Sequence, residues 1–188
     1  MAKSKATKKW VKKEMNKTLF ITHTVGHLEK LLKLEIGGLP RMLICFSLVE
    51  FGGRAFATKE EDYDTKDKYK GFFKLMFTKM AEVTNNRLYE NNDSINNLYD
   101  GWRNGLAHML VPTKDFSVGD NVEQRNNHML LRGGKIVISD KRVVWDLIKT
   151  FDYFISDHQE ESVEIFVEDN VNDNADLNYG VASSNYLQ

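Results

Sequence analysis

The segment from residue 40 to residue 56, PRMLICFSLVEFGGRAF, constrains the fold of this chain more than any other. Its apolar residues surround a helix almost completely instead of forming one stripe, and such a helix is normally buried at the centre of a protein. Pro40 suits its first turn, and Gly37 or Gly38 can end the helix before it. The sequence therefore predicts a central helix over residues 40–56.

Two features interrupt this apolar segment. Glu50 is its only acidic residue. Gly52 and Gly53 follow two residues later, and a glycine pair lowers helix stability by about 1 kcal/mol per residue relative to alanine. The glycine pair therefore predicts either a kink or the close approach of another element.

Further helices are expected around the central one, because apolar residues recur at helical spacing elsewhere. The predicted segments are residues 9–35, residues 66–83, a helix capped by Asp93 or Ser94 and ended by Pro112, and a last helix capped by Asp140. Residues 113–127 resemble a polar loop. The following HMLLRGGKIVIS indicates a β-hairpin that turns at Gly133-Gly134. The predicted fold class is all-α, an antiparallel bundle of about five helices with a small hairpin insert before the last one.

The two ends of the chain carry opposite charge. Residues 1–17 hold seven Lys and one Glu, and residues 157–188 hold eight acids and no Lys or Arg. We expect a basic flexible arm over 1–9, a helical domain over 10–160 and an acidic, largely disordered tail over 161–188, with VEIFV as a candidate short strand. The arm would either bind RNA or DNA phosphates or remain a solvated terminus; the lysines concerned are Lys5, Lys8, Lys9, Lys12 and Lys13.

The chain has one cysteine, so no disulfide can form within it and a reducing compartment is expected. Cys45 lies in the apolar run MLICFSLV and is interpreted as a small buried hydrophobe. The basic start lacks the apolar stretch of a secretory signal, and no apolar run approaches the ~20 residues of a membrane span. The expected location is cytoplasmic.

The stretch NNLYDGWRNGLAHMLVP contains the residues with the most distinctive chemistry, Arg103, Asn104 and His108. Asn104 and His108 are four residues apart and share a helix face. Arg103 and His108 are five apart, about 140° around an ideal α-helix, so they form one site only at a helix end or with a second copy of the chain. A structural role is the alternative, with His108 at the helix dipole and Arg103 paired with the buried Glu50.

The string Arg-Asn-x-x-x-His near the end of a helix resembles the signature of the HEPN family (higher eukaryotes and prokaryotes nucleotide-binding). The preceding apolar helix with Glu50 is similar to the family's arrangement, and the resemblance covers roughly residues 10–158. It implies a metal-independent endoribonuclease without cofactors. His108 would be general base or acid, Arg103 would stabilise the phosphoryl charge, and Asn104 would position the phosphate or orient His108.

The same resemblance implies several partners and leaves alternatives. Glu50 would support Arg103, and a homodimer with the fourth helix at its interface would join two motifs over the RNA. A toxin or defence effector of this kind would have an antitoxin or a regulatory protein as a further partner. The alternatives are a non-catalytic HEPN-like scaffold that binds nucleotide, nucleic acid or protein, and a purely structural helical protein.

The remaining histidines give weaker signals. His23 and His27 have a spacing that can bind zinc, but a third ligand is missing because Glu29 lies about 120° round the helix. A solvent-exposed pair is the preferred interpretation. His128 and His158 have no evident partners, and neither GGR nor RGGK fits a phosphate loop.

Overall fold

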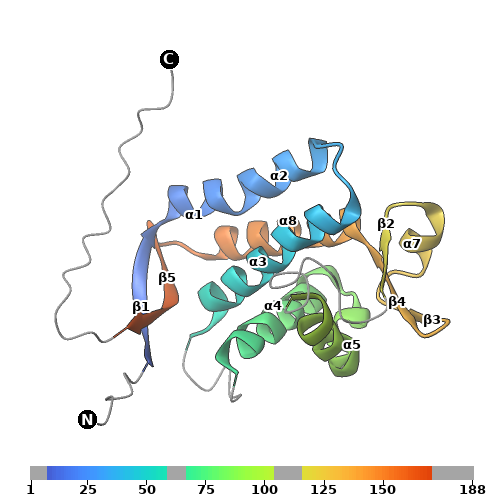
Figure 1. Ribbon diagram of the computed structural model, residues 1–188. Helices are drawn as coiled ribbons and strands as arrows, with labels where there is room; N and C mark the ends of the chain where they lie inside the picture. The colour runs from blue at the N-terminus through green and yellow to red at the C-terminus, as the bar shows by residue number, and fades with distance from the viewer. Residues whose placement is uncertain (1–7, 59–66, 104–115, 171–188) are drawn as a thin grey trace, which may run out of the picture.

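The computed structural model describes residues 8–58, 67–103 and 116–170. A body of helices occupies the middle of the molecule, and two small sheets lie at its opposite ends (Figure 1). The body contains α1 (Lys17–His23), α2 (Val25–Lys33), α3 (Gly38–Phe56), α4 (Lys68–Thr84) and α8 (Asp140–Asp157). None of the described helices combines the length and the hydropathy that a bilayer crossing requires.

Helix α3 is the central helix, as its composition predicts. It contacts α4 and α8, and Met42, Cys45 and Val49 are fully buried. Cys45 is the expected buried hydrophobe, and burial raises the pKa of its thiol far above the ordinary value. The helix starts two residues before Pro40.

The glycine pair of α3 marks a close helix crossing. A Cβ atom on Gly53 would lie 1.9 Å from the backbone oxygen of Phe72, which leaves no room for any side chain. One on Gly52 would lie 2.7 Å from the sulfur of Met76. The predicted close approach is therefore confirmed, and the approaching element is α4.

The predicted all-α fold class is wrong, because the molecule is a mixed α/β protein with two sheets. The first sheet is a ribbon of β1 (Lys8–Asn16) and β5 (Ser162–Asn170), paired antiparallel along their full length. The helix predicted over 9–35 thus begins only at Lys17, where the Asn16 side chain accepts hydrogen bonds from the N–H groups of Thr18 (2.9 Å) and Leu19 (3.3 Å). An Asn cap of this kind separates strand from helix.

The ribbon also corrects the predicted ends of the domain. Val163 and Ile165 of β5 are buried in the main core, so the folded domain continues past residue 160 and the tail predicted over 161–188 is not disordered over its first residues. Lys9 lies opposite Asp169 in the register. The basic N-terminal and acidic C-terminal segments, interpreted separately from the sequence, are partners in one ribbon.

The second sheet contains the predicted hairpin and an unpredicted strand. Strands β3 (Leu131–Arg132) and β4 (Lys135–Ser139) pair antiparallel, and Gly133 and Gly134 have φ of 55° and 78°, as a tight hairpin turn requires. Strand β2 (Phe116–Gly119) pairs parallel with β4, and α7 (Val122–Asn126) follows it. The segment 113–127 is therefore not a simple loop over its described part. Ser139, not Asp140, caps α8 by accepting from the N–H of Arg142.

The segment predicted as the fourth helix changes from α-helical to π-helical geometry within the described residues. A short 3₁₀ turn (Arg87–Glu90) leads to α5 (Asn92–Asn97), which Asn91 caps instead of Asp93 or Ser94. A π-helical turn, η3 (Leu98–Arg103), follows directly. Residues 104–115 lie outside the described residues.

Candidate functional site

The motif singled out in the sequence begins where the described part of this region ends. Arg103 is the last residue of η3. Its side chain, Asn104 and His108 lie outside the described residues, as do Trp102's side chain and Leu106 in the expected dimer surface. What the structure describes is the scaffold that leads to the motif.

That scaffold is anchored on one end of α4. The Lys70 ammonium donates to both carboxylate oxygens of Asp100, at 2.9 and 2.8 Å, and lies 5.6 Å from the centre of the Tyr99 ring. Tyr99 is buried edge-on against Phe73, with ring centres 5.4 Å apart. η3 is thus fixed at the turn of α4 that also meets Gly53 of α3.

Glu50 is buried on α3 close to the same crossing. Its carboxylate accepts a hydrogen bond from the guanidinium of Arg54, one helical turn later. The predicted pairing of Glu50 with Arg103 involves a side chain outside the described residues. Arg54 is not among the residues predicted from the sequence, although its i,i+4 spacing from a lone acid is a usable signal.

Arg54 in turn links the helices to the ribbon. Its guanidinium carbon lies 5.4 Å from the ring centre of Trp10 and 5.2 Å from that of Tyr69. The Tyr69 hydroxyl donates to Glu168 at 2.9 Å. The pKa of Tyr69 is raised, mainly because the side chain is partly buried and secondly because of this hydrogen bond. The cluster of Glu50, Arg54 and the two aromatic rings therefore joins α3, α4, β1 and β5.

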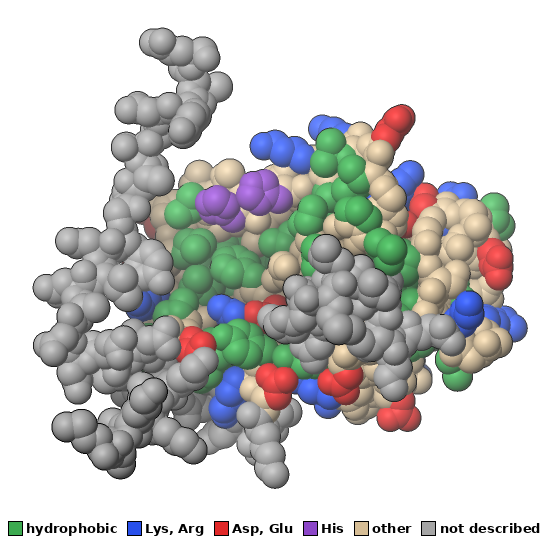
Figure 2. All heavy atoms as spheres, in the orientation of Figure 1, with side chains coloured by type: hydrophobic (Ala, Val, Ile, Leu, Met, Phe, Trp, Pro, Cys, Tyr) green, Lys and Arg blue, Asp and Glu red, His purple; other side chains and the backbone are tan. Residues whose placement is uncertain are grey.

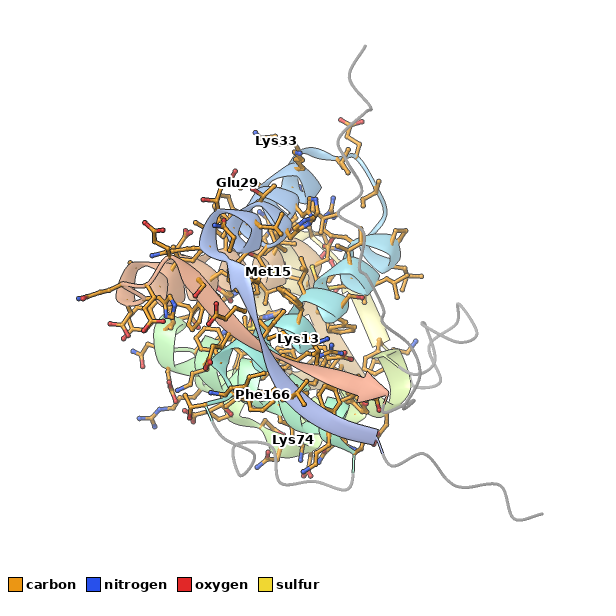
Figure 3. The ribbon with its side chains drawn as sticks, turned by 90° about the vertical axis from the view of Figure 1, so that its left-hand side faces the viewer. Lys13, Met15, Glu29, Lys33, Lys74 and Phe166 are labelled. Carbon is orange, nitrogen blue, oxygen red and sulfur yellow. The ribbon has the colours of Figure 1, made fainter. Side chains whose placement is uncertain are left out.

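The lysines of the predicted RNA-binding arm are partly engaged in the ribbon. Lys12 pairs with Glu164 across the strands at 2.8 Å and lies 5.6 Å from the Phe166 ring centre. Lys13 is exposed on the same strand, which crosses β5 in Figure 3. Lys8 and Lys9 belong to β1 but their side chains are not described, and Lys5 lies outside the described residues. From Lys8 onward, the segment predicted as a flexible arm is part of strand β1.

A second polar group was not foreseen from the sequence, and it surrounds His128. This histidine is buried and its Nδ1 accepts from the backbone N–H of Ser139 at 3.1 Å. A neutral ring must then carry its proton on Nε2, which lies 2.8 Å from the Tyr89 hydroxyl and donates to it. The Tyr89 hydroxyl donates onward to Oδ2 of Asp146 at 2.8 Å.

Burial determines the protonation of this chain of hydrogen bonds. It lowers the pKa of His128 from 6.5 to about 3, with a further lowering by the nearby Arg142, so the ring is neutral. It raises the pKa of Asp146, partly offset by the Tyr89 hydrogen bond. Tyr89 is fully buried and its pKa is raised well above the ordinary value, so it remains a donor.

A pocket opens above Asp146, between α7, α8 and the end of β4. Its volume is about 380 Å³, and its lining consists of Asp120, Arg125, Ser139, Lys141, Arg142, Trp145, Asp146 and Lys149. Lys141 pairs with Asp120 at 3.3 Å, and Nε of Arg142 lies 3.7 Å from Oδ2 of Asp146. Four cationic side chains and two carboxylates therefore face one solvent-accessible hollow.

His23 and His27 are both exposed, as expected, with ring centres 5.3 Å apart on the surface of α1 and α2 where Figure 2 shows histidines. Within residues 8–58, 67–103 and 116–170, no group of three or more His, Cys, Asp or Glu side chains is arranged to hold a metal ion. His158 has a partner that the sequence did not reveal, since its Nε2 lies 2.6 Å from the carbonyl oxygen of Ser162.

Comparison with known proteins adds no relative to this picture: no family model matches the chain, and no curated protein or solved structure matches it either.

Proposed function

We propose that this protein is a metal-independent endoribonuclease of the HEPN type. The observation that carries the proposal is that the Arg-Asn-x-x-x-His motif continues directly from a π-helical turn anchored on α4. π-helical turns are rare and occur frequently at functional sites. The ideal offset of about 140° between Arg103 and His108 assumes α-helical winding, and η3, which ends at Arg103, departs from that winding where the motif begins.

The buried Glu50 of α3 supports the same proposal. Gly53 brings α3 into contact with the turn of α4 on which η3 is anchored, and Glu50 lies on α3 three residues before Gly53. Glu50 is already paired with Arg54, and its proposed part is to support Arg103 as well. A buried carboxylate of this kind needs such a partner.

The proposed chemistry needs no metal. His108 removes the proton of the ribose 2′-hydroxyl or protonates the leaving 5′-oxygen, for which an imidazole is suited by its ordinary pKa of about 6.5. Arg103 stabilises the charge of the phosphoryl group with its fork of N–H donors, and Asn104 positions the phosphate. The products are a 2′,3′-cyclic phosphate and a 5′-hydroxyl. A homodimer would bring two such motifs together.

The test is cleavage of mixed RNA by the purified protein in EDTA, followed by end-group analysis. His108→Ala should lower the rate ~10²–10⁴-fold, and Arg103→Ala should also abolish cleavage. His23→Ala is the matched control, because His23 is exposed on α1 and lies far from the motif in the sequence. The proposal fails if His108→Ala cleaves RNA as fast as the parent protein.

The non-catalytic alternative is a scaffold that binds nucleotide or nucleic acid. It is favoured by the cationic pocket above Asp146, which has no part in the proposed cleavage. Binding of RNA by a protein that never cleaves it, with His108→Ala unchanged in affinity, would support this alternative.

A further inference from the structure

Trp145 is the most unusual residue of the pocket above Asp146. It lies on α8 with 54% of its surface exposed, although tryptophan is normally well covered in a folded protein. Lys141 and Lys149 are four residues before and after it, so the three side chains form one stripe on the helix. The stripe presents a flat aromatic surface between two ammonium groups.

A second stripe on α8 lies beside the first. Arg142, Asp146 and Lys149 follow one another at spacings of four and three residues. Arg125 of α7 faces them across the pocket. The cations outnumber the carboxylates four to two, and Lys149 belongs to no ion pair of the described residues. The pocket thus retains positive charge after its internal pairs are counted.

The two carboxylates are held in fixed positions. Asp120 is bound by Lys141 and by the Ser139 hydroxyl at 3.2 Å. Asp146 is held from below through Oδ2, to which Tyr89 donates and which Arg142 approaches, whereas Oδ1 takes part in no hydrogen bond of the described residues. The floor of the pocket therefore offers one oriented acceptor beside an aromatic ring.

We infer that this pocket binds one nucleotide unit, with the base stacked on Trp145 and the phosphate held by Arg142, Lys149 and Arg125. Base stacking on aromatic side chains combined with cationic contacts to the phosphate is the usual way in which proteins bind single-stranded nucleic acid. Oδ1 of Asp146 accepts a hydrogen bond from an N–H group at the edge of the base. A volume of about 380 Å³ is sufficient for one such unit.

The nucleotide could be free or part of a strand, and the two sources share this chemistry. The inference does not depend on the proposed nuclease, because none of the pocket residues belongs to the Arg-Asn-x-x-x-His motif. Under either source, the base and the phosphate must both contribute to binding. Ribose 5-phosphate, which lacks the base, should therefore bind more weakly than GMP.

The test is binding of the full chain to GMP by calorimetry and to a fluorescein-labelled 2′-O-methyl oligoribonucleotide by anisotropy. The 2′-O-methyl strand cannot be cleaved by 2′-hydroxyl attack, so the result is separate from that of the nuclease assay. Trp145→Ala should weaken binding about tenfold, within the range of a lost stacked base. The double variant Arg142→Gln/Lys149→Gln should also weaken it and reduce the slope of log affinity for the strand against log salt by about 1.4, because each phosphate contact of a single strand contributes about 0.7.

Two matched controls give the test its meaning. Tyr153→Ala removes another exposed aromatic ring of α8, 57% exposed and outside this pocket. Lys30→Gln/Lys135→Gln removes two exposed lysines elsewhere. If Trp145→Ala loses strand binding and keeps GMP binding, the pocket is assigned to a strand. If Trp145→Ala loses both, the pocket is assigned to nucleotides in general. The inference is overturned if the parent protein binds neither probe, or if Trp145→Ala binds both as tightly as Tyr153→Ala does.

Discussion

Helix α3 is specified by its own residues, whereas the β1–β5 ribbon is specified by the pairing of two distant segments. The helix follows from its own residues, because an apolar surface on every side permits only a central position. Strand β1 becomes a strand only through β5, whose residues lie more than 140 positions further along the chain. The lesson is that a short segment with a mixed pattern follows the partner that tertiary structure supplies.

The largest effect is expected at the crossing of α3 and α4. Gly53→Ala places a methyl group against the Phe72 carbonyl, and a backbone atom cannot move aside as a flexible side chain can. We expect a loss of about 3 kcal/mol in the free energy of unfolding, at the upper end for overpacking. Gly26→Ala in α2 is the control, since its Cβ meets only the Ile21 oxygen at 3.8 Å. Urea unfolding of both variants measures the difference, and equal stabilities would contradict the tight crossing.

The ribbon should contribute almost as much through β5. Ile165→Ala removes a side chain that is 6% exposed in the main core and should cost about 2–3 kcal/mol. Its neighbour Glu164 is exposed, so Glu164→Ala should change stability by under about 1 kcal/mol. Thermal unfolding distinguishes the two. A tail that is disordered over 161–188 predicts a nearly unchanged melting temperature when residues 164–188 are deleted, whereas the burial of Ile165 leads us to expect a marked decrease.

A smaller effect is expected when the pH is lowered. His128 is neutral when folded, with its pKa lowered to about 3, whereas the unfolded chain takes up a proton near 6.5. Below pH 6.5 the unfolded state binds more protons, so stability contributed by this site decreases by about 1.4 kcal/mol per pH unit. The raised pKa of Asp146 acts in the opposite direction. The stability that this carboxyl contributes is greatest at low pH and is lost as the pH rises through its raised pKa in the folded protein. Urea unfolding at pH 7 and pH 5 should show a drop of about 2 kcal/mol that is absent in His128→Gln; an unchanged slope in that variant would contradict the assignment.

The smallest effect is expected from the charges of the ribbon. Lys12 and Glu164 are 36% and 54% exposed, and such surface pairs contribute about 0.2–1 kcal/mol. A double-mutant cycle with Lys12→Gln and Glu164→Gln should give a coupling in that range which disappears at high salt. The Lys79–Glu82 pair on α4 is the matched pair within one helix. A coupling above about 2 kcal/mol would show that this pair stabilises the ribbon far more than a surface pair does.

Part of the candidate site was also accessible from the sequence. Glu50 was predicted to be buried and in need of a cationic partner, and the lone acid of an apolar helix is a sufficient reason for that prediction. Its described partner, Arg54, was overlooked. The motif residues Arg103, Asn104 and His108 remain predictions. Nothing in the sequence indicated that His128, Tyr89 and Asp146 would meet. Tyr89 is 39 residues before His128 and 57 residues before Asp146.

The sequence by itself determined the elements whose pattern repeats within one segment. These are the buried faces of α3, α4 and α8 and the Gly133-Gly134 turn, since helical periodicity and positive φ are local properties. Tertiary structure alone decided the β1–β5 ribbon, the parallel pairing of β2 with β4, and the pocket with Trp145 above Asp146. The physical reason is that strand pairing and buried polar networks depend on which distant residues become neighbours, and a linear pattern carries no information on that choice.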